Sequence, residues 1–253
     1  MLIISPFKIK LNTNLFLPHF LQKFVLIILI IQQSTINNYE RMHIAITGNI
    51  GAGKTTLATK LAEHFGWEVL YEAVEGNPYL SPFYEDMPRW AFHLQMYFLK
   101  SRYEQVLQIQ KSNRRIIQDR TIYEDAHIFA MNLYKSGIMT ANDYTTYRGI
   151  FDLMMRSVKA PDLTIYLRAD LPKLVSQIKK RGRDFELNIS EKYLADLNEH
   201  YEEFTSNYKE GKLLILEVND LDFVNNPSDL AKIIVKVDKA LLYDKQPELA
   251  FEN

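Results

Sequence analysis

Short apolar stretches alternate with longer segments of helical periodicity between residues 42 and 242. Five of the short stretches have the composition of β-strands, namely His43–Thr47, Glu68–Tyr71, Arg115–Gln118, Asp162–Leu167 and Leu213–Glu217. Helical patterns separate all five. This alternation predicts an α/β fold in which helices wrap a five-stranded parallel sheet.

The intervening segments place apolar residues three and four positions apart, which is typical of helices. The predicted helices are 56–65, Trp90–Asn113, Thr121–Tyr134, Asn142–Ser157, Leu171–Lys180, Ser190–Tyr208 and Pro227–Leu242. In the longest of them, the predicted apolar face consists of Phe92, Met96, Leu99, Tyr103 and Leu107. Gly66 and Gly137 follow two of the helices and are expected to end them.

On this pattern the chain divides into three parts. Residues 42–243 contain all predicted elements and form one domain, and residues 244–253 are expected to be a tail. Residues 1–41 contain the apolar run Phe24–Ile31, which is far shorter than the roughly 20 residues that span a bilayer. No small-residue cleavage site follows this run. We expect an N-terminal extension outside the domain, with a membrane anchor or a targeting leader as the alternative.

Composition narrows the classes of function. Hydrophobic residues make up 47% of the chain and charged residues 24%, so a packed core is expected. A net charge of −1 argues against a nucleic-acid polymer as partner. The absence of cysteine excludes disulfides and thiol chemistry, which suits the cytoplasm. The six histidines show no metal-ligand spacing.

A phosphate-binding loop follows the first predicted strand. Residues 48–56 match the pattern G-x-x-x-x-G-K-[ST], and the residues are Gly48, Asn49, Ile50, Gly51, Ala52, Gly53, Lys54, Thr55 and Thr56. Glycines let the backbone N–H groups surround an anion. Lys54 supplies a charge for the outer phosphates of a nucleotide, and the Thr55 hydroxyl can bind Mg²⁺. The predicted strand before and helix after the loop argue against a mere glycine-rich turn.

Charged residues end the second and third predicted strands, at the sheet edge where ligands bind in parallel sheets. Glu72 is placed to accept a proton from an attacking hydroxyl, unless it is a solvated loop residue. Asp119 can bind Mg²⁺ directly or through water, and Arg120 can stabilise transferring phosphoryl charge. The alternative for this pair is an ion pair that caps the helix beginning at Thr121.

Two further patterns are weaker on their own. Four cations surround Gly182 in Lys179–Arg183, which suggests a lid over phosphates or a plain basic surface. Gln95 and Arg102 lie seven residues apart on one helical face and can read the edge of a base. Taken alone, this second pair would be assigned to the protein surface.

Together these motifs resemble the deoxynucleoside kinase family over residues 42–242. The resemblance implies a P-loop kinase fold with a short basic lid, ATP as phosphate donor, Mg²⁺, and a homodimer. Glu72 takes the place of the catalytic base, although Ala73 replaces the proline that usually follows it. By resemblance Gln95, Arg102 and Asp125 contact the base, while Tyr84 and Glu186 contact the sugar. Arg181 and Arg183 belong to the lid, and Asp222 and Phe223 to the loop that holds the donor adenine.

The expected reaction is transfer of the ATP γ-phosphoryl group to the 5′-hydroxyl of a 2′-deoxynucleoside, in nucleotide salvage. In the family, the arginine and acid at Arg102 and Asp125 accompany purine and cytosine recognition, so a deoxypurine is favoured and deoxycytidine is a second substrate. A nucleoside monophosphate kinase such as thymidylate kinase is the first alternative. It needs an extra arginine pair near Glu72, which the sequence does not display. A non-catalytic nucleotide-binding protein is the second alternative, but no guanine-reading motif is present.

Overall fold

The computed structural model of the protein describes residues 41–74, 76–183, 186 and 189–242. The predicted N-terminal extension, apart from Arg41, and the predicted tail lie outside the described residues. None of the helices in the described part of the chain has both the length and the apolar character that a bilayer crossing requires.

The five predicted strands form one parallel sheet in the order β2-β3-β1-β4-β5. Their bounds are β1 Met42–Gly48, β2 Glu68–Leu70, β3 Arg115–Asp119, β4 Leu163–Arg168 and β5 Leu213–Glu217. The central strand β1 is buried along its whole length and pairs with β3 and β4. Ile46 of β1 lies beside Asp119, and Gly48 lies beside Leu167. The carboxyl ends of the central strands therefore meet where the phosphate loop begins.

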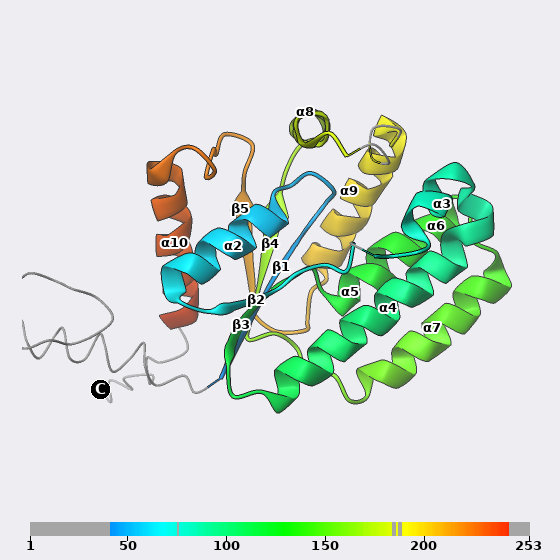
Figure 1. The fold of residues 1–253 in the computed structure, drawn as a ribbon, viewed down its shortest axis with the longest axis horizontal. Helices are drawn as coiled ribbons and strands as arrows, with labels where there is room; N and C mark the ends of the chain where they lie inside the picture. The colour runs from blue at the N-terminus through cyan, green and yellow to red at the C-terminus, as the bar shows by residue number, and fades with distance from the viewer. Residues whose placement is uncertain (1–40, 75, 184–185, 187–188, 243–253) are drawn as a thin grey trace, which may run out of the picture. The chain divides into compact units, whose positions relative to one another are not determined.

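Helices cover both faces of the sheet. Their bounds are α2 Lys54–Phe65, α3 Leu80–Glu85, α4 Met87–Lys111, α5 Ile122–Glu124, α6 Met131–Lys135, α7 Ala141–Met155, α8 Leu171–Arg181, α9 Glu191–Ser206 and α10 Pro227–Leu242. A π-helical segment, η1 Asp125–Ala130, joins α5 to α6. Figure 1 shows α2 and α10 on one face of the sheet, and α4, α5 and α9 on the other.

Several predicted boundaries were wrong by a few residues. β2 ends at Leu70 rather than Tyr71, and β4 begins one residue later than predicted. The long helix α4 begins at Met87 rather than Trp90, because the Asp86 side chain accepts a hydrogen bond from the backbone N–H of Arg89 at 3.3 Å. The short helix α3 was not predicted. Gly66 ends α2 as expected, with a φ of 68° and its N–H on the carbonyl of Ala62.

The prediction of a single helix over Thr121–Tyr134 is also wrong, because the segment divides into α5, η1 and α6. A π-helical turn holds an extra residue and is found frequently at functional sites. Asp125 and Phe129 of η1 both line the main cavity described below.

The predicted apolar face of α4 is not its innermost face. Leu99 is fully buried, but Phe92, Met96 and Tyr103 are only partly buried and pack against the cluster that contains Tyr147 and Phe151 of α7. The buried face consists of Ala91, Leu94, Gln95, Leu99, Arg102, Val106 and Ile109. The polar side chains of Gln95 and Arg102 therefore lie on the buried face of this helix.

Candidate active site

The phosphate loop joins β1 to α2 in a conformation that requires glycine. Gly51 and Gly53 have φ angles of +87° and +95°. A Cβ atom would lie 2.8 Å from the Leu174 carbonyl oxygen at Gly51, and 2.8 Å from Cζ of Phe223 at Gly53. Any side chain would combine a disfavoured backbone region with a steric overlap.

Lys54 lies across this loop, buried, with Nζ donating to the carbonyl of Asn49 at 2.9 Å. Burial and the nearby Arg120 lower the pKa of Lys54 to about 7. A bound phosphate would favour the charged ammonium. The Asn49 side chain donates to the Leu194 carbonyl at 2.9 Å, so it attaches the loop to α9.

Thr55 and Asp119 form an oxygen-rich pair beside Lys54. The Thr55 hydroxyl donates to Oδ2 of Asp119 at 2.5 Å. Oδ1 of Asp119 is buried and has no hydrogen-bond partner among the described residues. Burial raises the pKa of this carboxyl group, and Lys54 opposes that shift. A hydroxyl and a carboxylate with a free oxygen suit Mg²⁺, which usually takes one or two carboxylates, waters and substrate phosphates.

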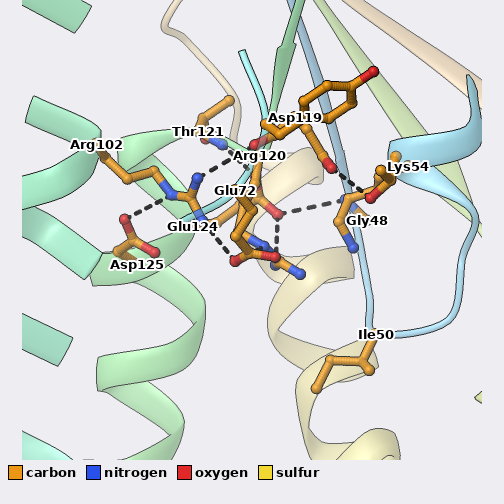
Figure 2. Close-up of polar contacts among 12 residues, drawn as sticks. Gly48, Ile50, Lys54, Glu72, Arg102, Asp119, Arg120, Thr121, Glu124 and Asp125 are labelled. Atoms are coloured by element: carbon orange, nitrogen blue, oxygen red, sulfur yellow. Dashed lines mark hydrogen bonds and ion pairs between the residues drawn. The ribbon is translucent and has the colours of Figure 1, made fainter. Parts of the chain in front are cut away.

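Glu72 lies between two arginines, as Figure 2 shows. Its Oε1 atom is 2.7 Å from Nη2 of Arg102 and 2.9 Å from Nε of Arg120. Burial alone would raise the pKa of Glu72, but Arg120, Arg102 and Lys54 outweigh it and lower that pKa to about 2. Glu72 is therefore an ionised acceptor, held in place by two guanidinium groups.

Arg102 also contacts Asp125, with 3.1 Å between Nε and Oδ2, and both side chains are almost fully buried. Burial raises the pKa of Asp125, and Arg102 and Arg120 oppose that shift. Arg102 thus links Asp125 to Glu72 (Figure 2). Oε1 of Gln95, on the same helix face, is buried and without a hydrogen-bond partner in the described part of the chain. It is available to a ligand.

Side chains from the basic segment meet Glu186. Arg181 and Arg183 both form ion pairs with its carboxylate, the second at 3.3 Å. Glu186 is buried, whereas the arginines are partly exposed. Tyr84 lines the same cavity, and burial raises its pKa, so its hydroxyl stays protonated.

One cavity of about 730 Å³ brings most of the predicted site residues together. Those that line it are Ile50, Gly51, Gly53, Lys54, Thr55, Thr56, Glu72, Tyr84, Gln95, Asp119, Arg120, Asp125, Arg181, Arg183 and Glu186. Those that do not line it are Gly48, Asn49, Ala52, Arg102, Asp222 and Phe223. Phe223 packs against Gly53, and Asp222 accepts hydrogen bonds from the backbone of Val224 and Asn225. Phe223 therefore borders the phosphate loop, while the hydrogen bonds that Asp222 accepts lie within its own loop.

Sequence reasoning missed three residues around Arg120. The guanidinium carbon of Arg120 lies 4.6 Å from the ring centre of Phe129, which lines the cavity. Glu124 and Tyr201 contact the Nη1 atom of Arg120. The spacing of Thr121 and Glu124 matches a helix capping box and gave a local signal for Glu124. No local signal exists for Tyr201, because it is 81 positions from Arg120.

A family model described as deoxynucleoside kinase matches residues 44–242. The deoxyadenosine/deoxycytidine kinase of Bacillus subtilis (strain 168) is 36% identical over 205 residues, which are 80% of this chain and 94% of the relative. The deoxyadenosine kinase of Dictyostelium discoideum is 40% identical over 195 residues, which are 77% of this chain and 78% of the relative. A solved structure of deoxyadenosine kinase from M. mycoides, with the products dCMP and a flexible dCDP bound, matches with a TM-score of 0.70 and 34% identity. That match covers 78% of this chain and 100% of the solved chain.

Proposed function

The chain belongs to the deoxynucleoside kinase family, and we propose that it transfers the γ-phosphoryl group of ATP to the 5′-hydroxyl of a 2′-deoxynucleoside. The observation that carries this proposal is the position of Glu72. An ionised carboxylate faces the same cavity as the phosphate loop, between two arginines, so an acceptor hydroxyl at Glu72 would lie near the donor phosphates. Positioning and electrostatics supply most of the rate enhancement in this reaction class.

Each charged group has a proposed role in the reaction. Lys54, Arg181 and Arg183 neutralise charge on the donor phosphates, and Arg120 orients the acceptor hydroxyl beside them. Glu72 accepts the proton of the 5′-hydroxyl as the oxygen attacks the γ-phosphorus. Thr55 and Asp119 would hold Mg²⁺, which neutralises phosphate charge when bound. The free Oδ1 atom of Asp119 supports that assignment.

We propose that four other side chains of the same cavity bind the nucleoside. Gln95 and Asp125 face the base, and Tyr84 and Glu186 the sugar. We infer that the acceptor is a deoxypurine nucleoside, with deoxycytidine as a second substrate. The names of the relatives support this range, and the dCMP bound to the M. mycoides enzyme shows that a family member holds a cytosine nucleotide.

The spatial arrangement corrects one argument made from the sequence. An arginine pair does lie near Glu72, because the fold brings Arg102 and Arg120 onto it. Both arginines already face carboxylates, since Arg102 also contacts Asp125 and Arg120 also contacts Glu124. A monophosphate acceptor needs uncompensated cations, so this pair does not provide a cradle for a second phosphate.

A panel of acceptors tests the proposal. With ATP and Mg²⁺, we expect transfer to deoxyadenosine or deoxyguanosine to be fastest, deoxycytidine to be slower, and thymidine to be the poorest nucleoside. We expect no phosphoryl transfer to thymidine monophosphate, because the two arginines at Glu72 are already paired with carboxylates. The values of kcat/KM, measured for each acceptor, rank them. Transfer to thymidine monophosphate alone would contradict the proposal, as would ATP binding without transfer to any acceptor.

Removal of residues 1–41 is expected to leave this activity intact. All site residues proposed here, from Gly48 to Phe223, follow Met42, where β1 begins. A protein consisting of residues 42–253 should have the kcat and the unfolding temperature of the full chain. Loss of transfer by the shorter protein, with the full chain active, would show that the extension contributes to the domain.

We further propose a cytoplasmic homodimer. Apolar side chains of α4 and α7 support the homodimer. Phe92, Met96 and Met154 are only partly buried, and Leu153 is 59% exposed. A second copy would cover this surface.

A further inference from the structure

Arg120 has an unusual backbone conformation at the edge of the site. Its φ of +74° makes it the single non-glycine residue with a positive φ among those that the structure describes. An arginine rarely adopts this region, because its Cβ atom crowds the following carbonyl. The backbone N–H of Arg120 donates to the carbonyl of Ile46 at 2.9 Å, which fixes the turn at the end of β3. The surrounding contacts must therefore hold this residue in place.

Two fully buried side chains supply such contacts. Nη1 of Arg120 donates to Oε1 of Glu124 at 3.1 Å and to the hydroxyl of Tyr201 at 2.9 Å. The Tyr201 hydroxyl lies 2.7 Å from Oε1 of Glu124 and 2.8 Å from the carbonyl oxygen of Gly48. Since the hydroxyl has one proton, it donates to one of these oxygens at a time. Together the two side chains connect Arg120 to the first residue of the phosphate loop (Figure 2 shows Glu124 and Gly48).

A purely structural role does not account for all of these contacts. Glu124 caps α5 through Oε2, which accepts from the N–H of Thr121 at 2.7 Å, so the cap leaves Oε1 for Arg120. The ring of Tyr201 packs on that of Tyr166, with centroids 5.6 Å apart and an angle of 9° between the planes. That packing requires the ring of Tyr201 but not its hydroxyl.

We propose that Glu124 and Tyr201 are positioning residues, which hold the guanidinium of Arg120 at the angle that the phosphoryl transfer requires. Nε of Arg120 contacts Glu72 while Nη1 contacts this pair, so the planar group is fixed from two sides. This inference rests on the proposed kinase function. On this proposal Arg120 and the phosphate loop are held as one unit, because the Tyr201 hydroxyl contacts both Arg120 and the carbonyl of Gly48.

The stacked tyrosines offer a matched pair of variants. Tyr201→Phe removes the hydroxyl on Arg120, whereas Tyr166→Phe removes a hydroxyl that donates to Glu202 at 3.0 Å, away from Arg120. We expect kcat to fall about tenfold in Tyr201→Phe, the effect of one hydrogen bond to a charged group. The KM values for ATP and nucleoside should change much less. Tyr166→Phe should keep the kcat of the wild type. The unfolding temperatures of both variants show how much stability each loses when its hydroxyl is removed.

A double-variant cycle tests whether Tyr201 acts through Arg120. Once Arg120→Lys has removed the planar guanidinium, addition of Tyr201→Phe should lower kcat little further. If Tyr201→Phe does not fold, Glu124→Gln replaces it in the comparison, because glutamine keeps an oxygen for the N–H of Thr121.

The outcomes separate the two proposals. An active wild type in which Tyr201→Phe and Tyr166→Phe have equal kcat would overturn the positioning role alone, and so would fully additive effects with Arg120→Lys. A wild type that phosphorylates no deoxynucleoside would overturn the proposed function and this inference with it.

Discussion

Replacement of Glu72 by glutamine should lower kcat by roughly 10²–10⁴, the usual range when a general base is removed. Glutamine keeps the shape of the side chain and one oxygen, so the hydrogen bond to an acceptor hydroxyl survives in part. It cannot take the proton. The KM for the nucleoside is therefore expected to change far less than kcat, which would place the loss in the transition state.

The environment of Glu72 explains why no neighbour replaces it. Glu124 and Asp125 pair with Arg120 and Arg102 as Glu72 does, but their side chains are only 0% and 3% exposed. Asp119 lies against Thr55, where we propose that it holds Mg²⁺. Among these carboxylates, Glu72 is the most exposed, at 22% for its side chain, and is accessible from the cavity that it lines.

A matched control exists on the preceding strand. Glu68 makes an exposed ion pair with Arg114 at 2.8 Å, so Glu68→Gln is the same substitution four residues away. Exposed pairs contribute little to stability, and we expect this control to keep the kcat of the wild type. Steady-state kinetics with saturating ATP measures both variants. A kcat for Glu72→Gln within about threefold of the wild type would exclude the general-base role.

The pH dependence of stability offers an independent check on Glu72. Its pKa is about 2 in the folded protein and 4.5 in an unperturbed glutamate, because Arg120 and Arg102 outweigh burial. The unfolded chain therefore binds the proton first as the pH falls, and this carboxylate stabilises the fold fully only above about pH 4.5. The contribution disappears between pH 4.5 and 2, so the stability difference between wild type and Glu72→Gln should shrink there.

The sequence predicted those parts of the site that depend on short segments or strand ends. The phosphate loop is continuous from Gly48 to Thr56, so its geometry is encoded locally. Glu72, Asp119 and Arg120 follow strands of one parallel sheet, and the rule that ligands bind at the carboxyl edge places them together. The parallel direction of the five strands followed from the alternation of elements, whereas their order in the sheet was not predicted.

The sequence did not predict which charged side chains contact one another across the fold. The apolar stripe assigned to α4 overlooked its innermost face, because two polar residues occupy buried positions there. Gln95 lines the cavity, and Arg102 contacts Glu72 and Asp125. The contact of Arg102 with Glu72 joins residues 30 positions apart, and that of Tyr201 with Gly48 joins residues 153 apart. Periodicity carries no information on such pairs, and polar residues in the core run against the pattern that identifies a core.

Removal of both Arg102 and Asp125 should weaken discrimination between bases. In the double variant Arg102→Met, Asp125→Ala, we expect the kcat/KM for thymidine relative to deoxycytidine and the deoxypurines to rise roughly tenfold to a hundredfold. Asp125 can accept a hydrogen bond from an exocyclic amine, which thymine replaces with a carbonyl oxygen. An acid facing that oxygen leaves two acceptors unpaired in a buried site.

The double variant is the informative form of this test, because it leaves neither partner of the buried pair as an isolated charge. Glu72 loses one of its two arginines but keeps Arg120, so kcat is expected to fall for every nucleoside. The ranking of the nucleosides is therefore the measurement that bears on specificity. The absolute values of kcat instead measure how much Arg102 contributes to holding Glu72.

The same helix supplies the control. Lys100 and Glu104 form an exposed ion pair at 2.9 Å on α4, with side chains 65% and 60% exposed. The double variant Lys100→Met, Glu104→Ala deletes an ion pair from α4 without touching the cavity, and it should leave the ranking of the four nucleosides unchanged. An Arg102→Met, Asp125→Ala protein that still ranks thymidine last by the wild-type margin would show that other groups of the cavity, with Gln95 and Phe129 the first to examine, distinguish the bases.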